Sequence, residues 1–244
     1  MKKQKKLLVT LISILAVIVF IAGIFFGYTA VYYHAVDVDT YLESSSTVQV
    51  ENNSNSITFK PLDKNATTGF IFYPGAKVEA EAYAPLAKKL AEDDIYTVIV
   101  KMPFNLAMFG INKADSVISS TPSISSWYLG GHSLGGAMGS IYTSRNYEKL
   151  DGLVLLASYS TKDLSSSGLK VATIVGSNDQ VMKANEFENN KSNLPSNTSF
   201  NTIEGGNHGN FASYGHQKGD GEATITMVEQ INQTATIIEN LIKA

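Results

Sequence analysis

The amino-terminal part of the chain is a cluster of lysines followed by a long hydrophobic run. Four of the first six residues are Lys, and no charged residue occurs from Leu7 to Ala30. At 1.5 Å per residue, a helix over Leu7–Phe26 is about 30 Å long, which matches the hydrocarbon core of a bilayer. The pattern therefore predicts one membrane-spanning helix at the start of the chain.

The competing interpretation of this run is a cleaved secretory signal, whose hydrophobic region covers only about 7–15 residues. The run here is longer, and Tyr28, Tyr32 and Tyr33 follow it as aromatic residues do at a membrane interface. Lysines that precede a span favour a cytoplasmic amino terminus. We therefore expect residues 1–33 to be a cytoplasmic tip and an uncleaved signal-anchor, which contacts the bilayer through residues 7–30. Everything after it is expected on the outer side of the cell membrane.

A polar stretch rich in Ser and Asn comes next and predicts a stalk at 34–45, which merges into an edge strand of a domain at 46–244. In that domain, short β-rich runs alternate with segments of helical periodicity. The expected strands are Ile57–Pro61, Gly69–Tyr73, Tyr96–Val100, Ser126–Gly131, Gly152–Ala157, Val171–Gly176 and Ser199–Ile203. The expected helices are Ala82–Glu92, Asn112–Ser119, Leu134–Asn146, Val181–Asn190 and Glu222–Lys243. This alternation predicts an α/β fold with a mostly parallel central sheet that helices cover on both faces.

Composition narrows the chemistry of this domain. The chain has 244 residues and no Cys, which excludes a disulfide framework, a thiolate nucleophile and Cys-bound zinc. Its hydrophobic fraction of 44% requires a core and excludes a disordered chain. A net charge of −3, with no basic stripe beyond Lys6, argues against a nucleic-acid partner.

Ser133 lies in a Gly-x-Ser-x-Gly sequence between an expected strand and an expected helix. Such a sharp turn holds the serine in strained dihedral angles and exposes its Oγ, and side chains at Gly131 or Gly135 would clash. Backbone N–H groups at the start of the helix, that of Leu134 first, would face a developing oxyanion. The simpler alternative is a glycine-rich turn that only packs a helix on a strand.

A serine hydroxyl is a weak nucleophile unless a base removes its proton and an acid orients that base. Asp179 and His208 follow two later strands, so the carboxyl ends of parallel strands would bring them close to Ser133. The simpler interpretations are a helix cap for Asp179 and an ordinary loop residue for His208. Asp163, after the preceding strand, is the best substitute acid, whereas Asp151 is expected to be a turn residue.

The other histidines do not displace His208 as the candidate base. His132 is expected to be held in the turn, facing away from the serine Oγ, and His34 follows the predicted span. His216 lies in a loop, where it is either exposed or lines the site. A second oxyanion donor is expected from the loop after an early strand, where Gly75 allows close approach of the backbone. We expect this donor to be the N–H of Ala76, with a simple turn as the alternative.

These segments, in this order, resemble the α/β-hydrolase superfamily over about residues 57–243. The resemblance rests on the turn at 131–136, the Asp179 loop, the His208 loop and the loop at 73–76. It is closest to the small single-domain branch with dienelactone-hydrolase-like and carboxylesterase-like proteins. Dienelactone hydrolases proper carry a Cys nucleophile, so Ser133 argues against that particular activity.

The resemblance implies an α/β-hydrolase fold and acyl transfer from an ester, thioester or amide to water. It also implies that Ser133 is the nucleophile, that His208 is general base and then acid, and that Asp179 fixes the imidazole tautomer. No metal or organic cofactor is implied.

The segment 158–170 is too short to form the cap that relatives insert at this point, so we expect an open site. A loop that is apolar where loops are usually polar suggests a pocket for a small acyl or aryl group. The residues expected to line it are Tyr73, Met102, Phe104, Met108, Phe109 and Tyr214. The alternative is that these side chains pack the edge of the sheet.

Three functions are compatible with this sequence. The first is a membrane-anchored, extracytoplasmic serine hydrolase that acts on small carboxylic esters or acylated envelope components. The second is an acyltransferase on the same site, because water and alcohols compete for one acyl-enzyme. The third is a binding protein that has kept the fold and lost catalysis. All three expected catalytic residues are present, which favours an enzyme.

Overall fold

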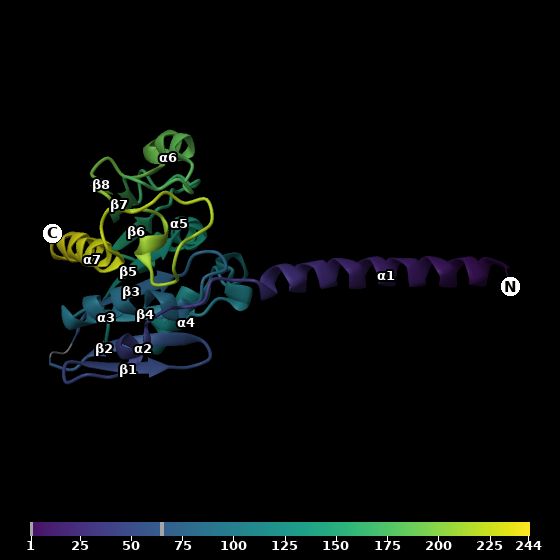
Figure 1. Ribbon diagram of the computed structural model, residues 1–244, viewed down its shortest axis with the longest axis horizontal. Coiled ribbons are helices and arrows are strands. Elements are labelled where there is room, and N and C mark those ends of the chain that lie inside the picture. Colours follow the sequence, from purple (N-terminus) through teal and green to yellow (C-terminus); the bar gives the residue numbers. More distant parts are fainter. Residues whose placement is uncertain (1, 64–65) are drawn as a thin grey trace. The chain divides into compact units, whose positions relative to one another are not determined.

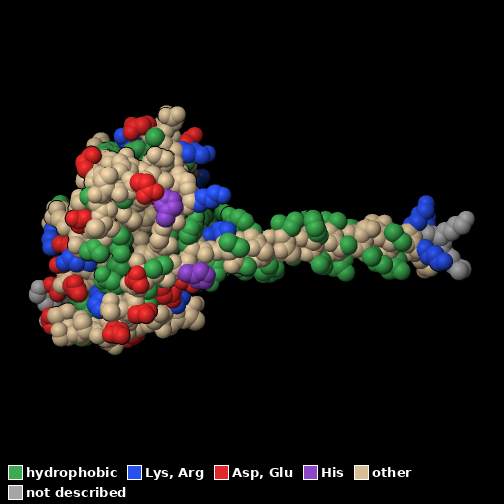
Figure 2. All heavy atoms as spheres, viewed as in Figure 1, with side chains coloured by type: hydrophobic (Ala, Val, Ile, Leu, Met, Phe, Trp, Pro, Cys, Tyr) green, Lys and Arg blue, Asp and Glu red, His purple; other side chains and the backbone are tan. Residues whose placement is uncertain are grey.

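A computed structural model describes residues 2–63 and 66–244 and contains two compact units, Met1–Tyr32 and Tyr33–Ala244. Residue 1 of the expected anchor and residues 64–65 of the expected domain lie outside the described residues. The first unit is helix α1 (Lys2–Ala30), the one helix in the described chain long and apolar enough to cross a membrane. Hydrophobic side chains cover it along its length, and lysines gather at its amino-terminal end (Figure 2).

The second unit is built on an eight-stranded sheet with the order β1-β2-β4-β3-β5-β6-β7-β8 (Figure 1). Its strands are β1 (Val48–Asn52), β2 (Ser56–Pro61), β3 (Thr68–Tyr73), β4 (Tyr96–Val100), β5 (Ser126–His132), β6 (Gly152–Leu156), β7 (Lys170–Gly176) and β8 (Ser199–Ile203). The first two strands pair antiparallel, β1 with β2 and β2 with β4, and the others pair in parallel. The mostly parallel sheet predicted from the alternating pattern is confirmed, with β1 and β8 as its two edge strands.

Helices cover both faces of this sheet. They are α2 (Asp39–Leu42), α3 (Ala84–Glu92), α4 (Lys113–Ser120), α5 (Leu134–Asn146), α6 (Ala184–Asn190) and α7 (Met227–Lys243). Buried side chains of α3 and α7 share one hydrophobic cluster, and those of α4 and α5 share another. Along β3, Phe70 and Phe72 enter the first cluster while Ile71 and Tyr73 enter the second, because successive strand residues point to opposite faces. Burial on both faces explains the continuous apolar runs of the central strands.

The segment that was expected to be a stalk, residues 34–45, makes contacts with the domain. The N–H of Val36 donates to the Ser213 carbonyl over 2.8 Å, the N–H of Ala35 donates to Glu79 Oε2 over 2.7 Å, and Val38 is buried. A polar composition did not predict this, because both hydrogen bonds are donated by backbone N–H groups, which every residue except Pro carries.

The carboxyl-terminal helix begins later than the apolar pattern predicts. It starts at Met227 because Thr226 caps it: the Thr226 side chain accepts the N–H of Glu229, and the Glu229 carboxylate accepts the N–H of Thr226. This reciprocal pair satisfies donors that the first helical turn leaves open. Ile231, Ala235 and Ile238, on one side of this helix, are buried against the sheet.

Candidate active site

The turn between β5 and α5 holds Ser133 in an unusual backbone conformation. Its φ of 53° and ψ of −122° lie in a region that residues other than Gly rarely adopt. Ser133 is partly accessible to solvent. A Cβ at Gly131 would stand 2.6 Å from the Gly135 carbonyl carbon, and a Cβ at Gly135 would strike the carbonyl oxygens of Tyr73 and Pro74. The two glycines therefore allow the turn to form and bring the loop after β3 against the start of α5.

Gly135→Ala is expected to displace the loop after β3, since its Cβ would meet backbone atoms that cannot rotate away. We expect a loss of about 1–3 kcal/mol in the free energy of unfolding, measured by urea denaturation of the full chain in detergent. Gly139→Ala, on the same helix, is the matched control because its Cβ would lie 3.5 Å from Leu129, an ordinary contact. Equal stabilities for the two variants would contradict the close approach of loop and helix.

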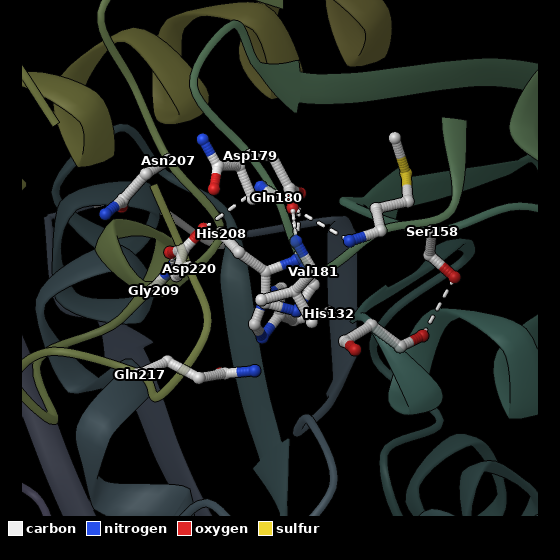
Figure 3. A network of polar contacts seen from close by, with 12 residues as sticks. His132, Ser158, Asp179, Gln180, Val181, Asn207, His208, Gly209, Gln217 and Asp220 are labelled. Atoms are coloured by element: carbon white, nitrogen blue, oxygen red, sulfur yellow. Dashed lines mark hydrogen bonds and ion pairs between the residues drawn. The ribbon is translucent and has the colours of Figure 1, made fainter. Parts of the chain in front are cut away.

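His208 and Asp179 form a buried pair at the carboxyl ends of β8 and β7. His208 Nδ1 lies 2.8 Å from Asp179 Oδ2, and the side chains are 1% and 2% exposed. The other carboxylate oxygen, Oδ1, accepts the N–H groups of Val181 and Met182, each over 2.8 Å (Figure 3). These two bonds hold residues 181–182 in a loop, which explains why α6 starts at Ala184 and not at Val181 as the sequence pattern predicts.

A cavity of about 280 Å³ connects this pair to the turn. Ser133, Leu134 and His208 line it together with residues from the loops after β6 and β7. His208 Nε2 is buried and has no hydrogen-bond partner in the described part of the chain. The structure thus brings Ser133, His208 and Asp179 to one place. A hydroxyl, an imidazole with an unused nitrogen and a carboxylate on the other nitrogen are the components for activating a nucleophile.

The two expected oxyanion donors lie on adjacent segments. Leu134 lines the cavity as the first residue of α5, and Ala76 belongs to the loop that Gly135 touches through Tyr73 and Pro74. Among the described residues neither N–H donates a hydrogen bond to a protein acceptor. Both are consequently available to an oxygen of a bound molecule, although Ala76 is not among the cavity-lining residues.

None of the six side chains expected to line the pocket lines this cavity, within the part of the chain that the structure describes. Tyr73, Met102 and Tyr214 are buried in the core. The Tyr73 hydroxyl donates to the Ile111 carbonyl and accepts the N–H of Ala114, so it holds α4. The remaining three, Phe104, Met108 and Phe109, are 44–48% exposed in the loop after β4. Met108 and Phe109 line a separate surface pocket of about 500 Å³ that contains neither Ser133 nor His208. The apolar loop therefore does not line the cavity of the candidate site.

The competing acids occupy other surroundings. Asp163 is exposed and accepts hydrogen bonds from Ser165, and Asp151 accepts the hydroxyl of Ser126 and the N–H of Trp127 as a turn residue. Neither of the two contacts His208. No group of three or more His, Asp or Glu side chains that could hold a metal ion is found among the described residues.

The competing histidines are also accounted for. His34 lies 3.0 Å from a Glu79 carboxylate oxygen, and His216 is exposed. His132 is 1% exposed, and its ring centroid lies 4.6 Å from that of His208, so it is much closer to the candidate base than the sequence indicates.

Three supporting side chains were not found by sequence reasoning. Ser158 donates its hydroxyl to the Ser133 carbonyl over 2.8 Å. The Asp220 carboxylate accepts the N–H groups of Gln180 and Gly209 and so joins the two loops that carry the acid and the base.

The third is Gln230, which is fully buried on α7 and pairs with the backbone N–H and C=O of Asn207, next to His208. The sequence offers one signal for this role: Gln230 is a polar residue next to Ile231 on the apolar side of a helix, and a buried amide needs hydrogen-bond partners.

Comparisons with known proteins agree on the fold. The chain resembles a CIB-like hydrolase from Thermoplasma acidophilum, with 13% identity and a TM-score of 0.60 over 79% of this chain and 98% of that one. It also resembles Est1E from Butyrivibrio proteoclasticus, with 12% identity, a TM-score of 0.60 and coverage of 82% and 100%. A third likeness is MGS-MChE2, an alpha/beta hydrolase enzyme from a lagoon-sediment metagenome, with 14% identity, a TM-score of 0.59 and coverage of 80% and 98%.

No curated protein matches the sequence. The sequence model of the alpha/beta hydrolase family matches residues 69–232, which is more than half of the chain. The chain therefore belongs to the alpha/beta hydrolase family.

Proposed function

We propose that this protein is a membrane-anchored serine hydrolase that cleaves small carboxylic esters through an acyl-enzyme. The observation that carries this proposal is the shared cavity: Ser133 and His208 line it, and Asp179 binds the far nitrogen of the His208 imidazole. A carboxylate on Nδ1 favours the tautomer whose free Nε2 can accept a proton.

In the proposed reaction His208 Nε2 takes the proton of the Ser133 hydroxyl while Oγ attacks the ester carbonyl carbon. The oxyanion that forms is stabilised by the N–H groups of Leu134 and Ala76. The carbon–oxygen bond to the alcohol then breaks, and His208 returns the proton to the departing oxygen. A water molecule then attacks the carbonyl carbon of the acyl-enzyme in the same way, with His208 as base, and the carboxylic acid is released. Asp179 stays ionised and orients the imidazole throughout.

The size of the cavity supports a small acyl group. A volume of about 280 Å³ is below the range of roughly 300–1,000 Å³ typical of drug-sized ligands. Its apolar lining includes Ala137, Ala157, Val181 and Met182. Est1E, one of the similar structures, has been solved with ferulic acid, a carboxylic acid, bound. The direct test is turnover of 4-nitrophenyl esters of increasing chain length by the full chain in detergent, where we expect acetate and butyrate to exceed octanoate. Absence of turnover with every ester would count against the proposal.

The cavity also suggests a charge preference. Apart from the ionisable His208, Lys183 is the only charged side chain that lines it, and Lys183 has no ion pair among the described residues. A cation at about 4 Å in water contributes about 1 kcal/mol, or roughly fivefold, to binding of an anion. We therefore expect Lys183→Ala to lower kcat/KM for a hemisuccinate ester about fivefold relative to a neutral ester of equal size.

This preference should fade at high salt, because exposed charges are screened. Lys60→Ala, on strand β2 beside the edge strand β1, is the control and should leave the ratio of the two kcat/KM values unchanged. An unchanged ratio in Lys183→Ala would show that the cavity does not select charge through this residue.

Helix α1 supports the proposed anchoring. Its length and apolar composition suit a membrane span, and the lysines that precede it favour a cytoplasmic amino terminus. The proposed arrangement is therefore a single-pass protein whose hydrolase domain lies on the outer side of the cell membrane.

Because the chain has no Cys, single cysteines report this topology cleanly. With a membrane-impermeant maleimide on intact cells, we expect Ser196→Cys, exposed in the domain, to be labelled and Gln4→Cys to be protected. Both variants should be labelled after the cells are lysed. The reverse pattern on intact cells would place the domain in the cytoplasm.

A further inference from the structure

A buried tyrosine and a buried histidine lie directly behind the candidate site. Tyr83 ends the 3₁₀ turn Ala80–Tyr83 and is 1% exposed, as is His132, the last residue of β5. The Tyr83 hydroxyl lies 2.8 Å from His132 Nδ1 and accepts the N–H of Gly75 over 2.9 Å. Neither side chain has a part in the reaction described above. Each lies next to a part of the site: Tyr83 binds the Gly75 N–H, and His132 contacts His208.

The direction of the hydrogen bond follows from the proton inventory. The Tyr83 hydroxyl has one proton, and its oxygen already accepts the N–H of Gly75. If His132 Nδ1 also carried a proton, the Tyr83 proton would be buried without an acceptor, which costs free energy. The buried Nε2 has no hydrogen-bond partner among the described residues in either tautomer. Only the tautomer protonated on Nε2 also pairs the Tyr83 proton, because Tyr83 can then donate to an unprotonated Nδ1.

The surroundings of His132 keep it neutral. Burial lowers its pKa well below the usual value, and the neighbouring His208 acts in the same direction. Burial also raises the pKa of Tyr83, so the hydroxyl keeps its proton. The ionisable groups around the pair are His208, Asp179 behind it and the buried Tyr214. A neutral ring is required beside His208, because a second cation would oppose the imidazolium that forms in the proposed reaction.

The pair connects two parts of that reaction. Through Gly75 it holds the backbone next to Ala76, the expected oxyanion donor. The packing at Gly75 is tight, because a Cβ there would lie 2.8 Å from His132 Nδ1 and 2.9 Å from the Tyr83 hydroxyl. Through the His132 ring it packs against the His208 imidazole, with ring centroids 4.6 Å apart and ring planes tilted by 49° (Figure 3).

We propose that Tyr83 and His132 form a positioning pair, which fixes where the Gly75–Ala76 backbone and the His208 ring lie relative to Ser133. This inference rests on the proposed hydrolase function, since it assigns the two residues a part in aligning that site. They act through other groups and do not contact the reacting atoms.

The test compares kcat and KM of the full chain in detergent, with an ester that the unmodified protein turns over. Tyr83→Phe and His132→Leu each break the shared hydrogen bond, and we expect kcat to fall on the order of 10- to 100-fold, with KM within about twofold, because reacting groups shift. The double variant should be no slower than the slower single variant, because both changes remove one interaction. His132→Asn, whose side-chain oxygen can replace the Nδ1 acceptor, should recover part of the kcat that His132→Leu loses.

Tyr142→Phe is the matched control for this series. Tyr142 is equally buried and donates to Asp115 over 2.8 Å, away from the cavity. It should lose thermal stability as Tyr83→Phe does, with kcat unchanged. If Tyr83→Phe and His132→Leu lose stability while their kcat stays within twofold of the unmodified protein, the pair is ordinary core packing and the proposal is wrong.

A measurement on the unmodified protein covers the case in which the variants do not fold. Nitrogen-15 NMR of the 4 histidines, assigned with His34→Gln and His216→Gln, should show His132 neutral and protonated on Nε2 from pH 5 to 8. A proton on Nδ1, or titration near pH 6.5, would overturn the pair. Failure of the hydrolase proposal looks different, because the unmodified protein would then turn over no ester while His132 could still show the expected state.

Discussion

Ser133→Ala is expected to lower kcat/KM for ester hydrolysis by on the order of 10⁵- to 10⁶-fold, the loss typical when a serine nucleophile is removed. Without Oγ no acyl-enzyme forms, and the remaining groups can only stabilise direct attack by water. The fold should persist, because the strained φ of 53° and ψ of −122° belong to the backbone, and alanine carries the same Cβ as serine. The measurement is single-turnover and steady-state hydrolysis of 4-nitrophenyl acetate by the full chain in detergent.

Ser158→Ala provides the control for this loss. Ser158 lines the same cavity, but its hydroxyl donates to the Ser133 backbone carbonyl and so has a supporting role. We expect a loss of about tenfold or less from removal of one hydrogen bond. If Ser133→Ala kept its activity and Ser158→Ala lost it, the nucleophile would be assigned to the wrong serine.

Asp179→Asn is expected to lower kcat by about 10³- to 10⁴-fold with little change in structure. The asparagine oxygen can still accept the N–H groups of Val181 and Met182, so the loop between β7 and α6 should hold its conformation. Its NH₂ group, however, cannot accept a hydrogen bond from an N–H at His208 Nδ1. The imidazole would then favour the tautomer protonated on Nε2, which cannot accept the proton of Ser133. The pre-steady-state acylation rate measures this directly.

Two other aspartates test whether this effect is specific. Asp163→Asn should leave kcat unchanged, because Asp163 is exposed and accepts hydrogen bonds only from Ser165 among the described residues. Asp220→Asn should have an intermediate effect, since Asp220 accepts three backbone N–H groups around the loops of Asp179 and His208 without contacting the imidazole. A larger loss of kcat in Asp163→Asn than in Asp179→Asn would show that the acid is Asp163 and that the assignment to Asp179 is wrong.

The elements that the sequence predicted well are those with strong local patterns. The central parallel strands β3 to β7 are largely apolar and buried on both faces. The turn at Ser133 needs glycines on either side for steric reasons that are visible in the sequence. The order of the loops after β7 and β8 then placed Asp179 and His208 at one edge of the sheet, where the structure joins them over 2.8 Å.

The features that the sequence did not predict depend on contacts between distant segments. The expected pocket was inferred from the apolar character of the loop after β4, yet apolar residues there either enter the core, as Met102 does, or remain on the surface, as Met108 does. The roles of Gln230 and Asp220 arise from backbone groups of other loops, which no local pattern records. The contact between His132 and His208 arises because the loop after β8 brings His208 to the end of β5.

The central claim is that Ser133 is an activated nucleophile, and covalent labelling tests it most directly. The full chain in detergent is treated with a fluorophosphonate probe, which requires no knowledge of the substrate, and is followed by intact and peptide mass spectrometry. We predict one adduct per chain, located on Ser133, absent in Ser133→Ala and formed far more slowly in Asp179→Asn. Folded protein that forms no adduct between pH 6 and 9, or that is labelled at another residue, would contradict the account.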